Sequence, residues 1–151
     1  MSDRHVLSPH LVCAGAADAI DFYQAAFGAV ELTRLTGPDG KLMHGCVNIN
    51  GSSVMLVDEM PQRGVLSPKA LGGSPVVIHL IVPDADAAIQ RAADAGATVV
   101  MPATDMFWGD RYGMVQDPFG HRWSMATPLR APMTSAELTA AMASMSPGCA
   151  S

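Results

Sequence analysis

Aromatic and ionisable side chains gather in one stretch of the chain, residues 107–127 (FWGDRYGMVQDPFGHRWSMAT). Phe107, Trp108 and Tyr112 supply the large ring surfaces that proteins use as walls for a flat ligand. Arg111 has the forked guanidinium that suits a carboxylate or phosphonate group. Structural roles are the alternatives: the rings would seal a sheet edge against a helix. For Arg111 we favour an ion pair that fixes the loop.

Two histidines stand in similar apolar contexts, His10 in HLVC and His79 in HLIV. An imidazole near its ordinary pKa can line a cavity, hydrogen-bond within it, or act as a general base. The sequence leaves these roles open for both residues. For His44 and His121 we expect a surface or packing role.

The elements that position these residues begin with a hairpin. Residues 111–116 and 121–126 alternate between apolar and polar side chains, which is typical of half-buried strands. Residues 117–120 (DPFG) form the turn, where Pro118 fixes φ and Gly120 permits a positive φ. We expect Asp117 to cap this turn.

The remaining pattern repeats. In the first half, strands are expected at 6–14, 30–36, 42–50 and 53–58, and a helix at 16–27. An irregular stretch follows. In the second half, a strand is expected at 76–82, a helix that Asp84 caps and that ends at 95, and a short strand at 98–101. HLVC and HLIV align 69 residues apart, and Gly28 and Gly96 align 68 apart. The sequence therefore predicts two copies of one β-α-β-β-β unit.

This repeat predicts one compact domain with four segments: 1–58 and 76–128 as the two modules, 59–75 as a linker or lid, and 129–151 as a tail. In the tail, Thr134 and Glu137 have capping-box spacing at the start of a helix over 134–145. Its apolar stripe is expected to pack on the body or on a partner subunit.

Composition limits the possible partners. With 151 residues, 49% hydrophobic residues and a net charge of −5, the chain has no basic stripe for nucleic acid and no apolar run long enough for a membrane. No leader pattern is present, so the expected location is cytoplasmic. The three cysteines lack a CxxC spacing and are expected to be reduced.

Four stretches together resemble the vicinal-oxygen-chelate superfamily, which includes glyoxalases, bleomycin-resistance proteins and ring-cleaving dioxygenases, and within it the PhnB-like branch. These are residues 16–29, 37–52, 107–113 and 117–127. The resemblance implies an α+β fold in which two tandem βαβββ modules form a U-shaped mixed sheet around a cavity. It also implies a homodimer.

Enzymes of this superfamily hold one divalent metal ion with ligands from the first and last strands of each module. By resemblance those positions fall, within a residue or two, on Ser8, Leu56, Val77 and Ser124, none of which is His, Glu or Asp. We therefore expect no metal cofactor. The alternative is a shifted Zn, Ni or Fe site made of His10, His79 and Asp58 or Glu59.

The sequence thus predicts a small-molecule-binding protein that sequesters or acts on a small aromatic or oxygenated ligand. The expected ligand-binding residues are His10, His79, Phe107, Trp108, Arg111 and Tyr112, and no catalytic residue is assigned. The alternative function is a metal-dependent lyase, isomerase or dioxygenase that uses the shifted site.

Overall fold

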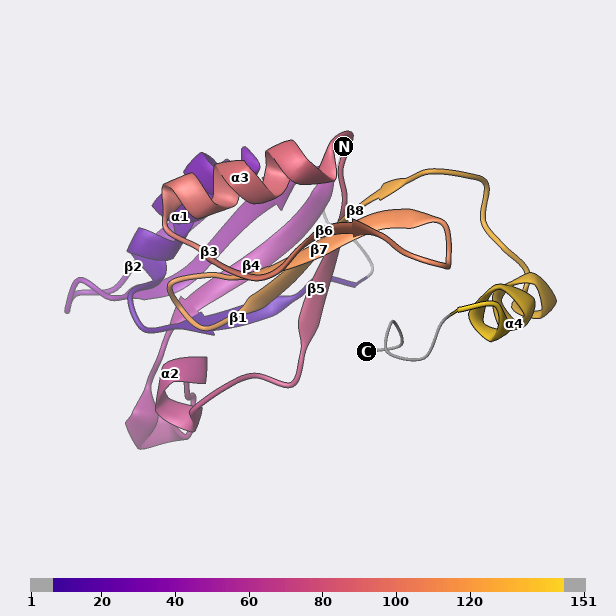
Figure 1. The fold of residues 1–151 in the computed structure, drawn as a ribbon. Helices are drawn as coiled ribbons and strands as arrows, with labels where there is room; N and C mark the ends of the chain where they lie inside the picture. Colours follow the sequence, from indigo (N-terminus) through magenta and orange to yellow (C-terminus); the bar gives the residue numbers. More distant parts are fainter. Residues whose placement is uncertain (1–6, 146–151) are drawn as a thin grey trace.

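The computed structural model describes residues 7–145, which form two similar halves and a C-terminal arm (Figure 1). The first half contains β1 (His10–Cys13), α1 (Ala16–Phe27), β2 (Val30–Thr36), β3 (Leu42–Ile49) and β4 (Ser52–Asp58). A connection with a 3₁₀ helix, η1 (Pro61–Arg63), and a short α2 (Pro68–Leu71) leads to the second half. That half contains β5 (Val77–Ile81), α3 (Ala85–Ala95), β6 (Thr98–Asp105), β7 (Asp110–Gln116) and β8 (Arg122–Pro128), and α4 (Ser135–Ala143) follows.

Both halves have the same sheet topology. The strand orders are β1-β4-β3-β2 and β5-β8-β7-β6, with β1 parallel to β4 and β5 parallel to β8. The predicted α+β fold with a duplicated unit is therefore confirmed. The described strands form two separate four-stranded sheets, and an imidazole contact joins them where Nε2 of His121 lies 2.9 Å from the carbonyl oxygen of Val12.

Several predicted elements differ from the structure. The first strand, expected at 6–14, spans only His10–Cys13. Strand β6 extends to Asp105, whereas the sequence suggested an end at Met101, before Pro102. Proline is tolerated there because β6 is an edge strand whose pairing with β7 shifts register between Met101 and Thr104. Residues 59–75 form a folded connection, in which the Ser67 side chain caps α2 and the backbone N–H of Ser67 donates to Glu59.

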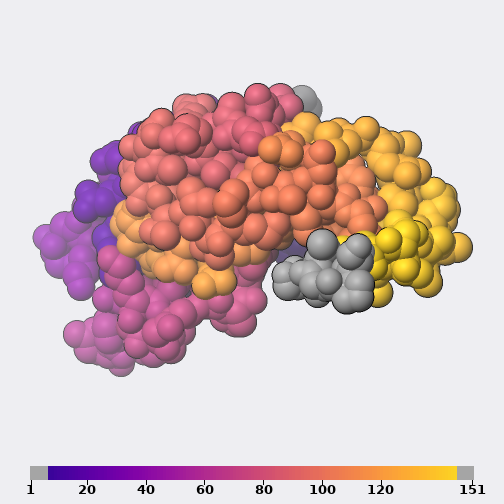
Figure 2. All heavy atoms as spheres, in the orientation of Figure 1, coloured from indigo at the N-terminus to yellow at the C-terminus, as the bar shows by residue number. Residues whose placement is uncertain are grey.

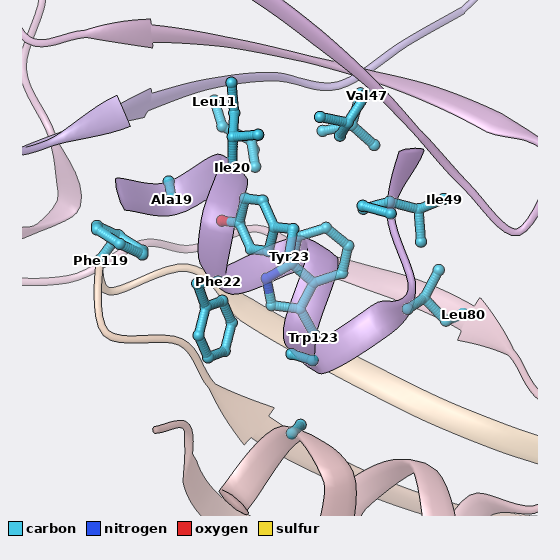
Figure 3. Close-up of a cluster of buried hydrophobic side chains, with 14 of the residues drawn as sticks. Leu11, Ala19, Ile20, Phe22, Tyr23, Val47, Ile49, Leu80, Phe119 and Trp123 are labelled. Atoms are coloured by element: carbon cyan, nitrogen blue, oxygen red, sulfur yellow. The ribbon is translucent and has the colours of Figure 1, made fainter. Parts of the chain in front are cut away.

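Helix α1 packs against the inner faces of both sheets. Figure 3 shows Tyr23 of α1 between Val47 and Ile49 of the first sheet and Trp123 of the second. The ring centroids of Tyr23 and Trp123 are 5.2 Å apart, and both side chains are fully buried. A single apolar core therefore spans the two halves.

A buried carboxylate joins the halves through hydrogen bonds. Asp117 lies in the β7–β8 turn, where its Oδ1 accepts from the backbone N–H groups of Phe119 and His121, both at 2.9 Å. This confirms the predicted turn cap. Its Oδ2 also accepts from the Tyr23 hydroxyl at 2.5 Å and from the Trp123 indole N–H at 2.9 Å. Burial, reinforced by the charge of Asp117, raises the pKa of Tyr23 well above its ordinary value.

The opposite faces of the sheets carry no helix and are called the outer faces below. Apolar side chains are exposed around them and along the edges, including Val30, Leu35, Val77, Ile81 and Val99. Helix α4, capped by Thr134, lies at the margin of the molecule away from α1 and α3 (Figures 1 and 2) and has no buried residue. Helix α4 itself, residues 135–143, thus buries no side chain on the body, and its packing on a partner stays a prediction.

Within residues 7–145, no helix has both the length and the apolar character required to cross a membrane. Residues 1–6 of the predicted first segment and 146–151 of the predicted tail lie outside the described range.

We predict that Asp117→Asn lowers the free energy of unfolding by about 2–4 kcal/mol, because an amide cannot accept all four hydrogen bonds and leaves buried donors unpaired. Tyr23→Phe removes a single donor and should cost about 1 kcal/mol. Urea denaturation monitored by tryptophan fluorescence measures both. An Asp117→Asn protein as stable as the wild type would show that this carboxylate does not hold the halves together.

Candidate functional site

The candidate site lies on the outer face of the β5–β8–β7 sheet. Strand register places His79 of β5 opposite Ser124 of β8, and Ala126 of β8 opposite Tyr112 of β7. Side chains of directly opposite residues point to the same face, and alternate residues of one strand do so too. The four side chains therefore share one face, on the far side of the sheet from Trp123.

His79 and Tyr112 cover the strand between them. Nδ1 of His79 lies 2.7 Å from Oγ of Ser124, and the His79 and Tyr112 rings are nearly parallel, with centroids 5.9 Å apart and an interplanar angle of 19°. Ser124 is only 2% exposed and Ala126 is fully buried, although both point away from the helices. The small side chains on β8 leave space for the two rings to approach each other across it.

Two more rings extend this arrangement. The Trp108 indole packs edge-on against Tyr112 (5.4 Å, 78°), and Phe107 packs edge-on against Trp108 (5.2 Å, 85°). The Trp108 indole N–H donates to Oδ2 of Asp110 at 3.1 Å, which fixes the orientation of the indole. We call His79, Tyr112, Trp108 and Phe107 the aromatic row.

A hollow of about 590 Å³ adjoins the aromatic row at His79, where the edge strands β1 and β5 of the two halves approach each other. Its lining is mainly apolar and includes His10, Val77 and Trp123. Two hydroxyl groups in its wall, those of Ser8 and Ser53, hydrogen-bond to each other at 2.5 Å. His10 and His79 thus both line one hollow, as the sequence allowed, whereas Phe107, Trp108 and Tyr112 do not line it. Tyr112 lies next to the hollow only through its ring contact with His79.

Arg111 does not belong to this group. It lies on the other face of β7 from Tyr112, where its guanidinium pairs with Asp86 of α3 at 2.5 Å and with Asp105 of β6 at 2.9 Å. The hydrogen bond from Arg111 lowers the pKa of the Asp86 carboxyl. Of the two interpretations of Arg111, the structure shows the ion pair. A ligand-binding role for Arg111 stays a prediction that this geometry does not favour.

The residues at the superfamily's metal positions do not fit a metal ion. Leu56 is fully buried in the core opposite Leu11, and the outer-face residue next to it is Met55, which lies opposite His10. The outer face thus offers a thioether here, together with the hydroxyl and aliphatic side chains of Ser8, Val77 and Ser124. These groups cannot make the nitrogen and carboxylate shell that Zn, Ni or Fe requires.

The alternative set of His10, His79, Asp58 and Glu59 is not assembled either. Asp58 Oδ1 accepts from the first backbone N–H groups of α1, those of Gly15 and Ala16, and its Oδ2 accepts from Leu42 N–H at 2.7 Å. Glu59 Oε2 accepts from Ser67 N–H. Among residues 7–145, no three His, Cys, Asp or Glu side chains are placed to hold a metal ion.

Sequence reasoning missed the partner of His79. Ser124 was noted only as a vacant metal position, and its hydroxyl instead holds the imidazole. The signal was available, because the repeat pairs the first strand of each half with the last, and matching their registers places residue 124 beside residue 79. The bond from Trp108 to Asp110 had no comparable signal.

The chain belongs to the glyoxalase/bleomycin resistance protein/dioxygenase superfamily, whose family model matches residues 4–125. An uncharacterized protein of Mycobacterium bovis is 56% identical over 145 residues, covering 94% of this chain and 95% of the relative. The crystal structure of the Arabidopsis thaliana product At5g48480 is 31% identical, with a TM-score of 0.66, and the match covers 82% of this chain and 98% of that one. A PhnB protein from Bacillus cereus shares the fold at 15% identity, with a TM-score of 0.63 and coverage of 82% and 99%. The predicted superfamily and the likeness to PhnB proteins are confirmed.

Proposed function

We propose that this protein binds a flat aromatic or oxygenated small molecule against the aromatic row and in the adjoining hollow, and that it does so without a metal ion. The observation that carries the proposal is four consecutive rings held on the outer face of a rigid sheet, beside a mainly apolar cavity. This geometry supports binding and sequestration, and no residue is assigned a catalytic role.

The rings are ordered before a ligand arrives. Tyr112 is held between His79 and Trp108, and Asp110 holds the Trp108 indole. Side chains that are already fixed lose little conformational entropy on binding, so more of the contact energy contributes to affinity. The hollow, at about 590 Å³, is of the size that proteins use for small-molecule ligands.

The absence of a suitable ligand set supports the metal-free part of the proposal. Both oxygens of Asp58 stabilise backbone N–H groups at the start of α1 and β3, so recruiting this carboxylate to a metal would expose buried donors. Sequestration is also a known mode of action in this superfamily, whose description includes bleomycin resistance proteins.

We further propose a homodimer in which a second copy covers the exposed apolar residues of the outer faces and leaves the aromatic row open to its ligand. Ile81, 56% exposed, and Val77, 41% exposed, lie on β5 beside His79. Val30 and Leu35 are exposed on the edge strand β2 of the other sheet. Apolar groups exposed on strands of both sheets mark surfaces that gain free energy when another chain covers them.

We predict that fluorene, an uncharged planar tricycle, binds saturably to the wild-type protein. Trp108→Ala should weaken binding about tenfold, because it removes ring contact and loosens Tyr112. Arg111→Met is the matched control, since Arg111 lies on the opposite face of the same strand, and its dissociation constant should equal that of the wild type. Fluorescence titration provides the constants. Failure of the wild type to bind, or equal affinity in Trp108→Ala, would contradict the proposed site.

We predict that protein purified without chelator or affinity tag contains no stoichiometric Zn, Ni or Fe. Adding each metal should leave the thermal midpoint unchanged, because no preformed shell exists to bind it. Elemental analysis and thermal denaturation test this. A stoichiometric metal ion that is lost in the His10→Ala, His79→Ala double variant would establish the metal-dependent alternative.

We predict a solution mass about twice the chain mass of 15.8 kDa. Ile81→Asp should convert the protein to a monomer, because it buries a charge in the apolar interface. Leu71→Asp is the control: Leu71 is even more exposed, at 65%, but lies on α2 and not on a strand of either sheet. Light scattering on these proteins, and on a chain lacking residues 134–151, also shows whether α4 contributes. A monomeric wild type at micromolar concentration would contradict the dimer.

A further inference from the structure

The Ser124 hydroxyl fixes the tautomer of His79. Ser124 is 2% exposed, and among the described residues its Oγ has a single hydrogen-bond partner, Nδ1 of His79. A buried hydroxyl proton without an acceptor costs about 1–3 kcal/mol. The arrangement that satisfies both atoms has the Ser124 hydroxyl donating to an unprotonated Nδ1. A neutral imidazole then carries its proton on Nε2.

The Nε2–H group has no partner among residues 7–145, and it faces away from the sheet. Nδ1 is directed at the buried Ser124, so Nε2 lies on the outer edge of an exposed ring that lines the hollow. The other nearby hydroxyl groups, those of Ser8 and Ser53, bond to each other. His79 therefore presents one directed hydrogen-bond donor beside the hollow.

The described part of the first half, residues 7–58, has no counterpart to this donor. His10 occupies the position equivalent to His79, and the residue opposite it is Met55. A thioether is at most a weak acceptor and has no proton to donate, so it cannot fix the His10 ring as the Ser124 hydroxyl fixes His79. The two histidines that match in sequence thus differ in what they offer a ligand.

We propose that His79 Nε2–H donates a hydrogen bond to the bound molecule, and that the ligand class is planar compounds with a ring-conjugated carbonyl oxygen. The carbonyl oxygen would accept this bond while the ring system lies against the aromatic row. Planar compounds that offer a donor at the same position would place two hydrogen atoms against each other, and planar hydrocarbons would leave the Nε2–H group without a partner. This inference rests on the proposed function and specifies its ligand.

Three tricyclic compounds of nearly the same outline test the inference: 9-fluorenone has a carbonyl oxygen, fluorene a methylene and carbazole an N–H at the same position. We expect the wild type to bind fluorenone about fivefold more tightly than fluorene, the effect of one neutral hydrogen bond, and carbazole no more tightly than fluorene. In His79→Phe, which keeps a ring beside Tyr112 but lacks the N–H, the fluorenone-to-fluorene ratio of affinities should fall to about one. Ser124→Ala should reduce the ratio, and Arg111→Met should leave it unchanged.

The outcomes separate this inference from the proposed function. Equal affinities for fluorenone and fluorene in the wild type, or a preference that persists in His79→Phe, would overturn the ligand class and leave aromatic binding intact. Failure of all three compounds to bind would overturn both. An independent readout is the ¹⁵N NMR spectrum of the imidazoles, in which the His79 signals are assigned by their loss in His79→Phe. We expect the Nε2–H tautomer, and an Nδ1–H tautomer would overturn the inference whatever the affinities.

Discussion

The structure depends on one buried carboxylate. Asp117 lies in the β7–β8 turn of the second half. It accepts a hydrogen bond from the Tyr23 hydroxyl, which belongs to α1 of the first half. Because Trp123 donates to the same oxygen, the carboxylate fixes the α1 helix against the inner face of β8. The residue that follows Trp123 is Ser124, on the outer face. The contact that joins the halves therefore also sets the depth and angle of the strand that supports the candidate site.

The candidate site depends on small side chains on β8 as well as on the large rings of the aromatic row. Four rings would not form a row if β8 carried bulky side chains, and Ser124 and Ala126 keep the space between β5 and β7 open. Asp110 then fixes the last indole that the row needs. The carboxylates that would serve a metal ion are instead bonded to the backbone. The recognition that we propose therefore relies on ring contact and one oriented hydrogen-bond donor.

The sequence predicted those features that arise from local patterns or from the repeat. The α1 helix, the Asp84 and Thr134 caps and the position of the β7–β8 hairpin were correct, because period and capping chemistry are local. The predicted half-buried alternation failed in β8, where residues 123–126 are buried on both faces. The metal-ligand position assigned to Leu56 proved to point into the core. Side chains alternate along a strand, so an error of one residue in the alignment moves a side chain to the opposite face of the sheet. The bond from Tyr23 to Asp117 spans 94 residues and leaves no local pattern. Arg111 was ambiguous because its acceptors, on α3 and β6, are brought close only by the tertiary fold.

The duplicated frame has a consequence for how a ligand lies in it. The backbone of the two halves approximates a twofold arrangement, with His10 and His79 at matching positions, but the residues opposite them are Met55 and Ser124. On one side of the hollow, Ser124 orients the His79 imidazole through a hydrogen bond. On the other side, the Met55 thioether cannot orient His10 in this way. A molecule bound as we propose would therefore meet unequal ends, which would favour one head-to-tail orientation even when its own outline is symmetric.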